Sequence, residues 1–258
     1  SVAARFFESY QSALTEAMAT NDYRLPGKLI GELDAYQKSK GMTVIPSPSR
    51  ISAEILLNKL SLFNRLAVFY ALLGATWLFM LFFSVFKPGA RLNSAYKILL
   101  ALVIAGFALH TIGLGLRWYV SERAPWSNGY ESMIYIAWTT LLAGVLFTRK
   151  SFGGMAATMI LSATVLLVAM LSYLDPEITP LVPVLRSYWL TIHVSMEAGS
   201  YGFLMLGAII GLINLILMIF ITQKNKEKIQ HQIREMSYLS EMTLIGGLFM
   251  ISIGTYLG

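Results

Sequence analysis

The stretch Arg186-Ser-Tyr-Trp-Leu-Thr-Ile-His-Val-Ser195 opens a long apolar run that continues to Thr222. Tyr and Trp rings favour the membrane–water boundary, where one side of the ring can be apolar and the other wet. Tyr188 and Trp189 therefore predict that a membrane helix begins here, with His193 near one face of the bilayer. An imidazole in this position can bind a metal through one nitrogen while another group orients the second nitrogen.

Two interpretations of His193 remain open at this point. The imidazole can be a metal ligand, or it can be a hydrogen-bonded residue at a helix mouth, which is the commoner situation for a single histidine. Glu197 lies four residues further on and should therefore share the same helix face.

The composition is typical of a membrane protein. Of the 258 residues, 56% are hydrophobic and only 13% are charged, whereas about 25% of the residues of a soluble domain are charged. The formal net charge is +6, but nine Lys and Arg residues fall in three short loops. That pattern favours membrane orientation over nucleic-acid binding. The chain has no cysteine, which excludes disulfides and thiolate metal centres within it.

Six apolar runs predict an all-α, polytopic membrane bundle. The spans are expected near residues 63–86, 96–120, 130–147, 152–173, 192–222 and 241–258. A span needs about 20 apolar residues, so the last one is expected to be truncated. Residues 63–258 should form the membrane domain. Residues 1–62 carry shorter helical patterns separated by turn residues, which predicts a mostly helical segment outside the membrane.

The basic residues predict the side of the membrane on which each loop lies. The loops after the first, third and fifth spans hold Lys87, Arg91, Lys97, Arg149, Lys150, Lys224, Lys226, Lys228 and Arg234. The other two loops hold Arg123 and Arg186, with Glu122, Asp175 and Glu177. The positive-inside rule puts the first set in the cytoplasm. The N-terminal segment, the loop around Trp126 and the helix mouth at His193 should therefore share the outer side.

Two ionisable residues of the second span are candidate site residues. His110 lies about midway along an apolar helix, where an ionisable side chain is a functional hypothesis by default. The alternative is a neutral histidine hydrogen-bonded to a neighbouring helix. Arg117 follows seven residues later on the same face, where it can meet an anionic ligand group or extend to the interface.

The loop Ala124-Pro-Trp-Ser-Asn-Gly-Tyr-Glu-Ser132 is rich in turn-forming residues. Ser127 or Asn128 can cap the third span, and Glu131 in its first turn suits the helix dipole. Capping explains most of this loop, and it leaves Trp126 as an aromatic ring held on a rigid turn.

Two stretches resemble a known family. His110-Thr-Ile-Gly-Leu-Gly-Leu-Arg-Trp-Tyr119, followed by the Ala124–Ser132 loop, resembles the start of the CcsA/ResC family of cytochrome c biogenesis proteins. Ser187-Tyr-Trp-Leu-Thr-Ile-His-Val-Ser195, with Gly199-Ser-Tyr-Gly202, resembles the segment that holds the family's first outer-face histidine. Sequence between Val44 and Lys59 is similar to the tail that precedes this domain in fused CcsBA-type synthases, so a fragment of such a fusion is expected.

The resemblance implies a heme-handling membrane protein of the bacterial cytoplasmic membrane. Members of the family carry heme b from the inner to the outer side. They present it for attachment to the Cys-x-x-Cys-His motif of apocytochrome c, the activity of a cytochrome c synthase or heme lyase. Heme, apocytochrome c, membrane lipid and a CcsB/ResB-like part are the partners that it implies. This fragment is expected to be inactive alone.

The resemblance also implies where heme binds. The family's outer site holds heme between two histidines that flank a tryptophan-rich segment. His193 matches the first of these by position and is therefore the expected axial ligand to the heme iron. Trp126, Arg117 and His110 are further candidates for heme binding.

The chain departs from the family pattern in two respects. The motif Trp-Gly-x-x-Trp-x-Trp-Asp is absent, and so are the second outer histidine and a later membrane histidine. In the family these follow a segment like Met242–Gly258, so truncation is expected to account for their absence. Two other functions stay open: a membrane assembly scaffold in which His193 is structural, and a small-solute permease, for which internal repeats would be typical.

Overall fold

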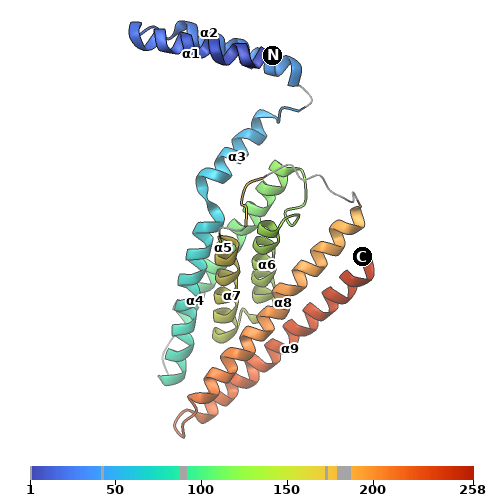
Figure 1. The fold of residues 1–258 in the computed structure, drawn as a ribbon. Coiled ribbons are helices and arrows are strands. Elements are labelled where there is room, and N and C mark those ends of the chain that lie inside the picture. Colours follow the sequence, from blue (N-terminus) through green and yellow to red (C-terminus); the bar gives the residue numbers. More distant parts are fainter. Residues whose placement is uncertain (1, 42–43, 88–91, 172–173, 179–186) are drawn as a thin grey trace. The chain divides into compact units, whose positions relative to one another are not determined.

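The computed structural model describes residues 2–41, 44–87, 92–171, 174–178 and 187–258 (Figure 1). Within these ranges every regular element is a helix, which confirms the predicted all-α fold. Arg91 and Arg186, which belong to the loops used to predict orientation, lie outside the described residues. The chain divides into two compact units, residues 1–51 and 52–258, which we describe separately.

The first unit is a helical hairpin. Helix α1 (Val2–Thr20) and helix α2 (Arg24–Gly41) pack against each other across a short turn (Figure 1). The turn is held by Asp22, whose carboxylate accepts hydrogen bonds from the Arg24 backbone N–H at 3.1 Å and from its guanidinium at 2.7 Å. The Arg24 guanidinium also holds the pKa of Asp22 below its usual value.

The second unit is a bundle of long apolar helices. Six helical segments among the described residues are long and apolar enough to cross a membrane, which confirms the predicted number of candidate spans. Its helices are α4 (Leu62–Phe86), α5 (Asn93–Ser121), α6 (Gly129–Ala143), α7 (Phe152–Ala169), α8 (Tyr188–Ile219) and α9 (Lys226–Leu257). Helix α3 (Pro48–Leu60) begins in the first unit and continues into the second. A π-helical turn, Gly144–Thr148, extends α6. Helices α3 and α4 form one apolar segment that is interrupted at Ser61, whose φ is 43°.

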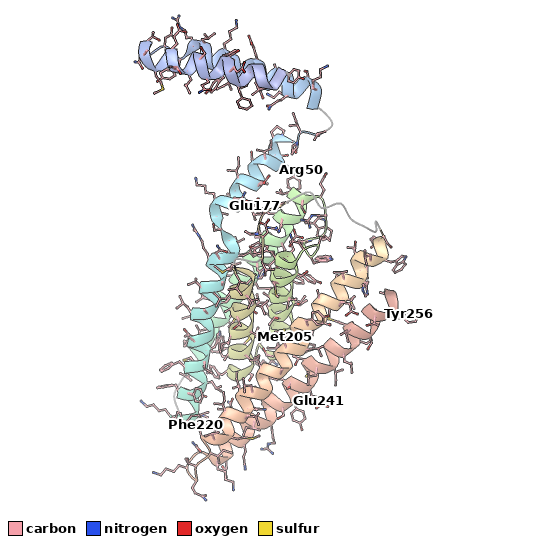
Figure 2. The ribbon with its side chains drawn as sticks, in the orientation of Figure 1. Arg50, Glu177, Met205, Phe220, Glu241 and Tyr256 are labelled. Atoms are coloured by element: carbon pink, nitrogen blue, oxygen red, sulfur yellow. The ribbon has the colours of Figure 1, made fainter. Side chains whose placement is uncertain are left out.

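Helices α8 and α9 form an antiparallel pair along their whole length (Figure 1). Phe220, just after α8, and Tyr256, near the end of α9, mark opposite ends of this pair (Figure 2). Helix α8 also packs on α6, α6 on α7, and α7 on α4. Close approach depends on glycine: a Cβ at Gly202 of α8 would lie 2.8 Å from the Thr140 nitrogen and 2.9 Å from the Ile136 oxygen of α6. Small residues at helix contacts are typical of membrane bundles.

Helix α9 differs from the sequence-based expectation. The polar sequence 223–240 predicts a helical extension and connector that precedes the last span, whereas most of it forms the first half of one continuous helix. No Gly or Pro occurs between Lys226 and Ile245, so nothing in the backbone stops the helix there.

The two ends of the bundle differ in composition. At one end the Lys228 ammonium donates to the Ser84 carbonyl, and the Phe220 ring packs 5.5 Å from that of Phe82. The described loop residues of this end include Lys87, Arg149, Lys150 and Lys224. The opposite end gathers residues 122–128 and 174–178, the start of α8 and the end of α9, and the next subsection concerns this end.

Candidate functional site

His193 lies in the second turn of α8 and faces α9. Its Nδ1 is 2.8 Å from the carbonyl oxygen of Gly254. One turn further along α8, the Glu197 carboxylate accepts a hydrogen bond of 2.8 Å from the Thr255 hydroxyl. His193 and Glu197 therefore share one helix face, as their spacing predicts. A Cβ at Gly254 would lie 3.1 Å from Glu197 Oε1 and 3.2 Å from the Met196 Cβ, so glycine lets the two helices approach.

The hydrogen bond of His193 determines its tautomer. A carbonyl oxygen can only accept, so Nδ1 must carry the proton that it donates to Gly254. In a neutral imidazole the lone pair then lies on Nε2. Among the described residues no hydrogen bond involves this Nε2, and the side chain is only partly buried. This is the arrangement that metal-binding histidines use, in which a carbonyl or carboxylate accepts the other ring N–H.

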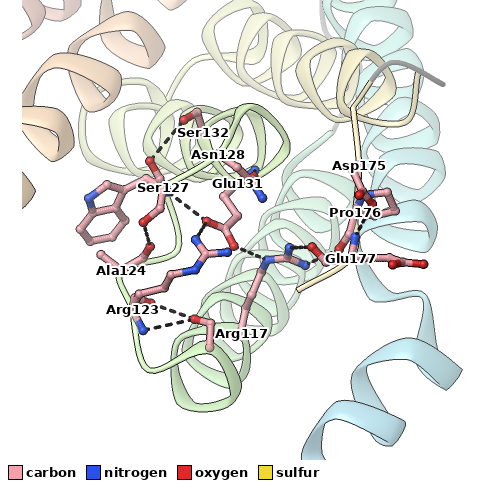
Figure 3. Close-up of polar contacts among 12 residues, drawn as sticks. Arg117, Arg123, Ala124, Ser127, Asn128, Glu131, Ser132, Asp175, Pro176 and Glu177 are labelled. Atoms are coloured by element: carbon pink, nitrogen blue, oxygen red, sulfur yellow. Dashed lines mark hydrogen bonds and ion pairs between the residues drawn. The ribbon is translucent and has the colours of Figure 1, made fainter. Parts of the chain in front are cut away.

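Arg117 and Glu131 form a buried ion pair (Figure 3). Arg117 Nε lies 3.1 Å from Glu131 Oε1, and the two side chains are 3% and 0% exposed. Arg123 Nη1 lies 2.5 Å from the other carboxylate oxygen of Glu131. Arg117 Nη1 also donates to the Pro176 carbonyl at 2.9 Å. These charged side chains thus link α5 to the start of α6 and to residues 174–178. Arg117 therefore does not extend to the membrane interface.

Glu131 also completes the cap of α6. The Asn128 side-chain oxygen accepts from the Glu131 backbone N–H at 2.7 Å, which confirms Asn128 as the capping residue. In return the Glu131 carboxylate accepts from the Ser127 backbone N–H at 3.0 Å. This differs from a capping box, in which the carboxylate returns to the N–H of the cap residue itself, because Glu131 binds the N–H of the preceding residue. Glu131 therefore sets both the loop conformation and the position of the two arginines.

Trp126 connects the loop to the start of α8. Its indole N–H donates to the Thr191 carbonyl at 3.3 Å, and its ring centroid lies 4.6 Å from that of Tyr135. The Tyr135 hydroxyl donates to the Ser195 carbonyl, also at 3.3 Å. Two residues along a helix rotate by about 200°, so His193 projects from a different face of α8 than Thr191 and Ser195. The structure therefore brings Trp126 and His193 to the same end of the bundle but to different faces of one helix.

His110 is fully buried between α4, α5 and α6. Its Nε2 lies 3.0 Å from the Ile134 carbonyl, and its Nδ1 lies 3.4 Å from the Tyr70 hydroxyl. The Tyr70 hydroxyl has a single proton, which it donates to the Gly106 carbonyl at the shorter distance of 2.9 Å. The ring is thus hydrogen-bonded within the protein through Nε2, as in the hydrogen-bonded alternative considered from the sequence. His110 and Arg117 share the buried face of α5, about 10 Å apart along the helix.

The sequence did not predict the roles that two residues of this region have, Glu131 and Tyr135. The role of Glu131 as a partner for two arginines had a signal, because Arg117 inside a span requires a nearby opposite charge. The role of Tyr135 in contacting α8 had no such sequence signal, since tyrosines are common in membrane spans. The described residues contain no group of three or more His, Asp or Glu side chains that could hold a metal ion.

The sequence of this region matches a family model. Residues 126–258, just over half of the chain, match the family described as "Cytochrome C assembly protein". The chain belongs to the cytochrome c assembly protein family. This confirms the resemblance to cytochrome c biogenesis proteins that the two sequence stretches indicate. The match begins at Trp126 and includes His193, whereas His110 and Arg117 precede it.

Individual relatives agree with this assignment. Protein NrfI of Wolinella succinogenes is 42% identical over 227 residues, which are 86% of this chain and 25% of NrfI. Cytochrome c biogenesis protein CcsA of Trieres chinensis is 32% identical over 154 residues, which are 58% of this chain and 48% of that protein. The CcsA protein of Prochlorococcus marinus (strain MIT 9303) is 38% identical over 124 residues, 46% of this chain and 38% of that protein. The chain thus spans between a quarter and a half of these cytochrome c assembly relatives.

Proposed function

We propose that this member of the cytochrome c assembly family binds heme through His193 and delivers it to apocytochrome c. In this proposal heme is the transported substrate, and it is joined to the Cys-x-x-Cys-His motif of the apoprotein by a heme lyase activity. The observation that carries the proposal is the hydrogen bond of 2.8 Å between His193 Nδ1 and the Gly254 carbonyl. That bond leaves the Nε2 lone pair of a neutral imidazole for the heme iron.

The chemistry assigned to His193 is axial ligation. A neutral imidazole nitrogen is a common axial ligand of heme iron. A carbonyl that accepts the Nδ1 proton fixes the ring orientation and makes Nε2 a stronger donor. With no cysteine in the chain, both thiols must come from the apocytochrome. The protein then accelerates attachment mainly by holding heme and apoprotein together in one orientation.

The other candidate residues support this site without touching the iron. Trp126 and Tyr135 bind backbone carbonyls on the first two turns of α8 and so hold the helix segment that carries His193. Arg117, through Glu131, fixes the loop on which Trp126 lies. We place this end of the bundle on the outer side of the bacterial cytoplasmic membrane, because the described basic loops lie at the other end.

The experiment uses the complete natural protein in cells that assemble a reporter cytochrome c. The variant His193→Ala should abolish covalent heme in the reporter, measured by heme-dependent peroxidase staining, while the level of the protein in the membrane stays normal. The matched control is His231→Ala, since His231 is exposed and lies in the first turns of α9, away from the His193 end. Equal holocytochrome levels in wild type and His193→Ala would contradict the proposed function.

A further inference from the structure

A cavity of about 210 Å³ lies where α3 meets α4. Arg117, Tyr130 and Phe63 line its inner part, and the exposed side chains of Asn58 and Asn64 lie at its rim. The cavity is separate from His193, and neither the capping of α6 nor the proposed iron ligation uses it.

Ser61, where the helix is interrupted, lines the cavity. The left-handed conformation of Ser61, with φ of 43°, interrupts the helix between α3 and α4. Beneath this break the Arg117 guanidinium lies over the Tyr130 ring, with its carbon 5.0 Å from the ring centroid. The Phe63 ring packs edge-on against Tyr130 at 6.5 Å. The result is a pocket with an aromatic floor, a polar rim and one buried cation.

The charges around this cavity are unbalanced. Glu131 is a single carboxylate between two guanidinium groups, those of Arg117 and Arg123. Arg123 Nη2 is buried and has no hydrogen-bond partner among the described residues. The side chains of Asp175 and Glu177 lie nearby but are exposed to solvent, where their charge is screened. Arg123 does not line the cavity, but it shares the one buried carboxylate with Arg117, which does. The two guanidinium groups together therefore carry one more positive charge than Glu131 balances, and such charges are normally paired.

We propose that this cavity binds the anionic group, a carboxylate or a phosphate, of an organic molecule. Arg117 supplies the counter-charge, Asn58 and Asn64 supply hydrogen-bond donors at the rim, and the rings of Phe63 and Tyr130 contact the adjoining carbon atoms. Sites that enclose a whole drug-sized ligand measure about 300 Å³ or more, so this smaller cavity takes an acidic arm or a headgroup. The proposal does not depend on iron ligation by His193.

The test measures binding of three small probes to the detergent-solubilised protein by saturation-transfer difference NMR. Propionate and methyl phosphate carry the anion, and propionamide is the uncharged isostere of propionate. Propionate and methyl phosphate should bind at least roughly tenfold more tightly than propionamide, because charge-assisted hydrogen bonds are about twice as strong as neutral ones. Equal binding of propionate and propionamide would overturn the proposal.

Variants assign the signal to this cavity. Asn64→Trp fills the cavity from its rim and leaves the ion pairs intact, and Arg117→Gln removes the cation. Both should abolish the difference between propionate and propionamide. The matched control is Arg65→Gln, which changes an exposed arginine of α4 that does not line the cavity. This variant should still bind propionate more tightly than propionamide. A difference that survives Asn64→Trp would place anion binding elsewhere and reject this site.

Competition identifies the natural source of the anion. Short-chain phosphatidylglycerol and heme are each added to the propionate complex, with heme dimethyl ester as the control that lacks free carboxylates. Displacement by the phospholipid assigns the cavity to a lipid headgroup, and displacement by heme but not its ester assigns it to a heme propionate. Either result supports an anion site, whereas displacement of propionate by the dimethyl ester as well as by heme would contradict it.

Discussion

Glu131→Gln should destabilise the protein more than any change at an exposed acid. Glu131 is fully buried and is the shared partner of Arg117 and Arg123. The amide keeps one oxygen that can accept hydrogen bonds but removes the negative charge, so two guanidinium groups lose their counter-ion. Removing one partner of a buried ion pair costs about 3–5 kcal/mol. At about 2–4 °C per kcal/mol for a domain of this size, the melting temperature should fall by roughly 6–20 °C.

The assay is thermal unfolding in detergent, followed by circular dichroism of the helices. Glu241→Gln is the matched control, because Glu241 lies on α9 with an exposed side chain, and exposed substitutions usually change stability by less than about 0.5 kcal/mol. Neutralising all three side chains, with Arg117→Met and Arg123→Met added to Glu131→Gln, should recover part of the loss, since no charge is then left unpaired. If Glu131→Gln melts within about 2 °C of Glu241→Gln, the ion pairs do not hold this region together.

Two further changes test the packing of the bundle. Gly202→Ala places a methyl group against the α6 backbone and should lower the free energy of unfolding by about 1–3 kcal/mol. Gly211→Ala on the same helix meets open space and should be neutral or stabilise by up to about 1 kcal/mol. Thermal unfolding compares the two variants, and equal melting temperatures would refute the close contact. Tyr70→Phe removes the hydroxyl that donates to the Gly106 carbonyl beside His110, so stability should fall by about 1 kcal/mol while the heme content of the purified protein stays unchanged. Loss of heme from this variant would instead give His110 a direct part in heme binding.

The number of spans could be predicted, and the start of α8 to within about one turn, because both depend on local sequence. Apolar runs of span length have few alternatives in a chain with so little charge. The aromatic pair Tyr188 and Trp189 indicates a helix mouth, and both side chains are largely exposed there, at 76% and 59%. The capping role of Asn128 was likewise one of two local possibilities, and the structure selects it.

The contacts of the candidate site could not be predicted, because their partners are distant in the sequence. His193 binds the carbonyl of Gly254, and a backbone carbonyl carries no sequence signal. Trp126 binds the carbonyl of Thr191 for the same reason. The sequence showed that Arg117 needs an explanation but not that Glu131, on the next helix, provides it. Helix pairing, which the apolar pattern leaves undetermined, decides these contacts.

If Nε2 of His193 binds heme iron, as we propose, replacing this side chain should change the absorption spectrum of the bound heme. The complete natural protein is purified from membranes with its bound heme, beside His193→Gly with and without added imidazole. His193→Gly should lose or shift the Soret band, and imidazole should restore it, because the free ligand can occupy the space left by the side chain. A Soret band in His193→Gly that matches wild type, with no response to imidazole, would rule out iron ligation by His193.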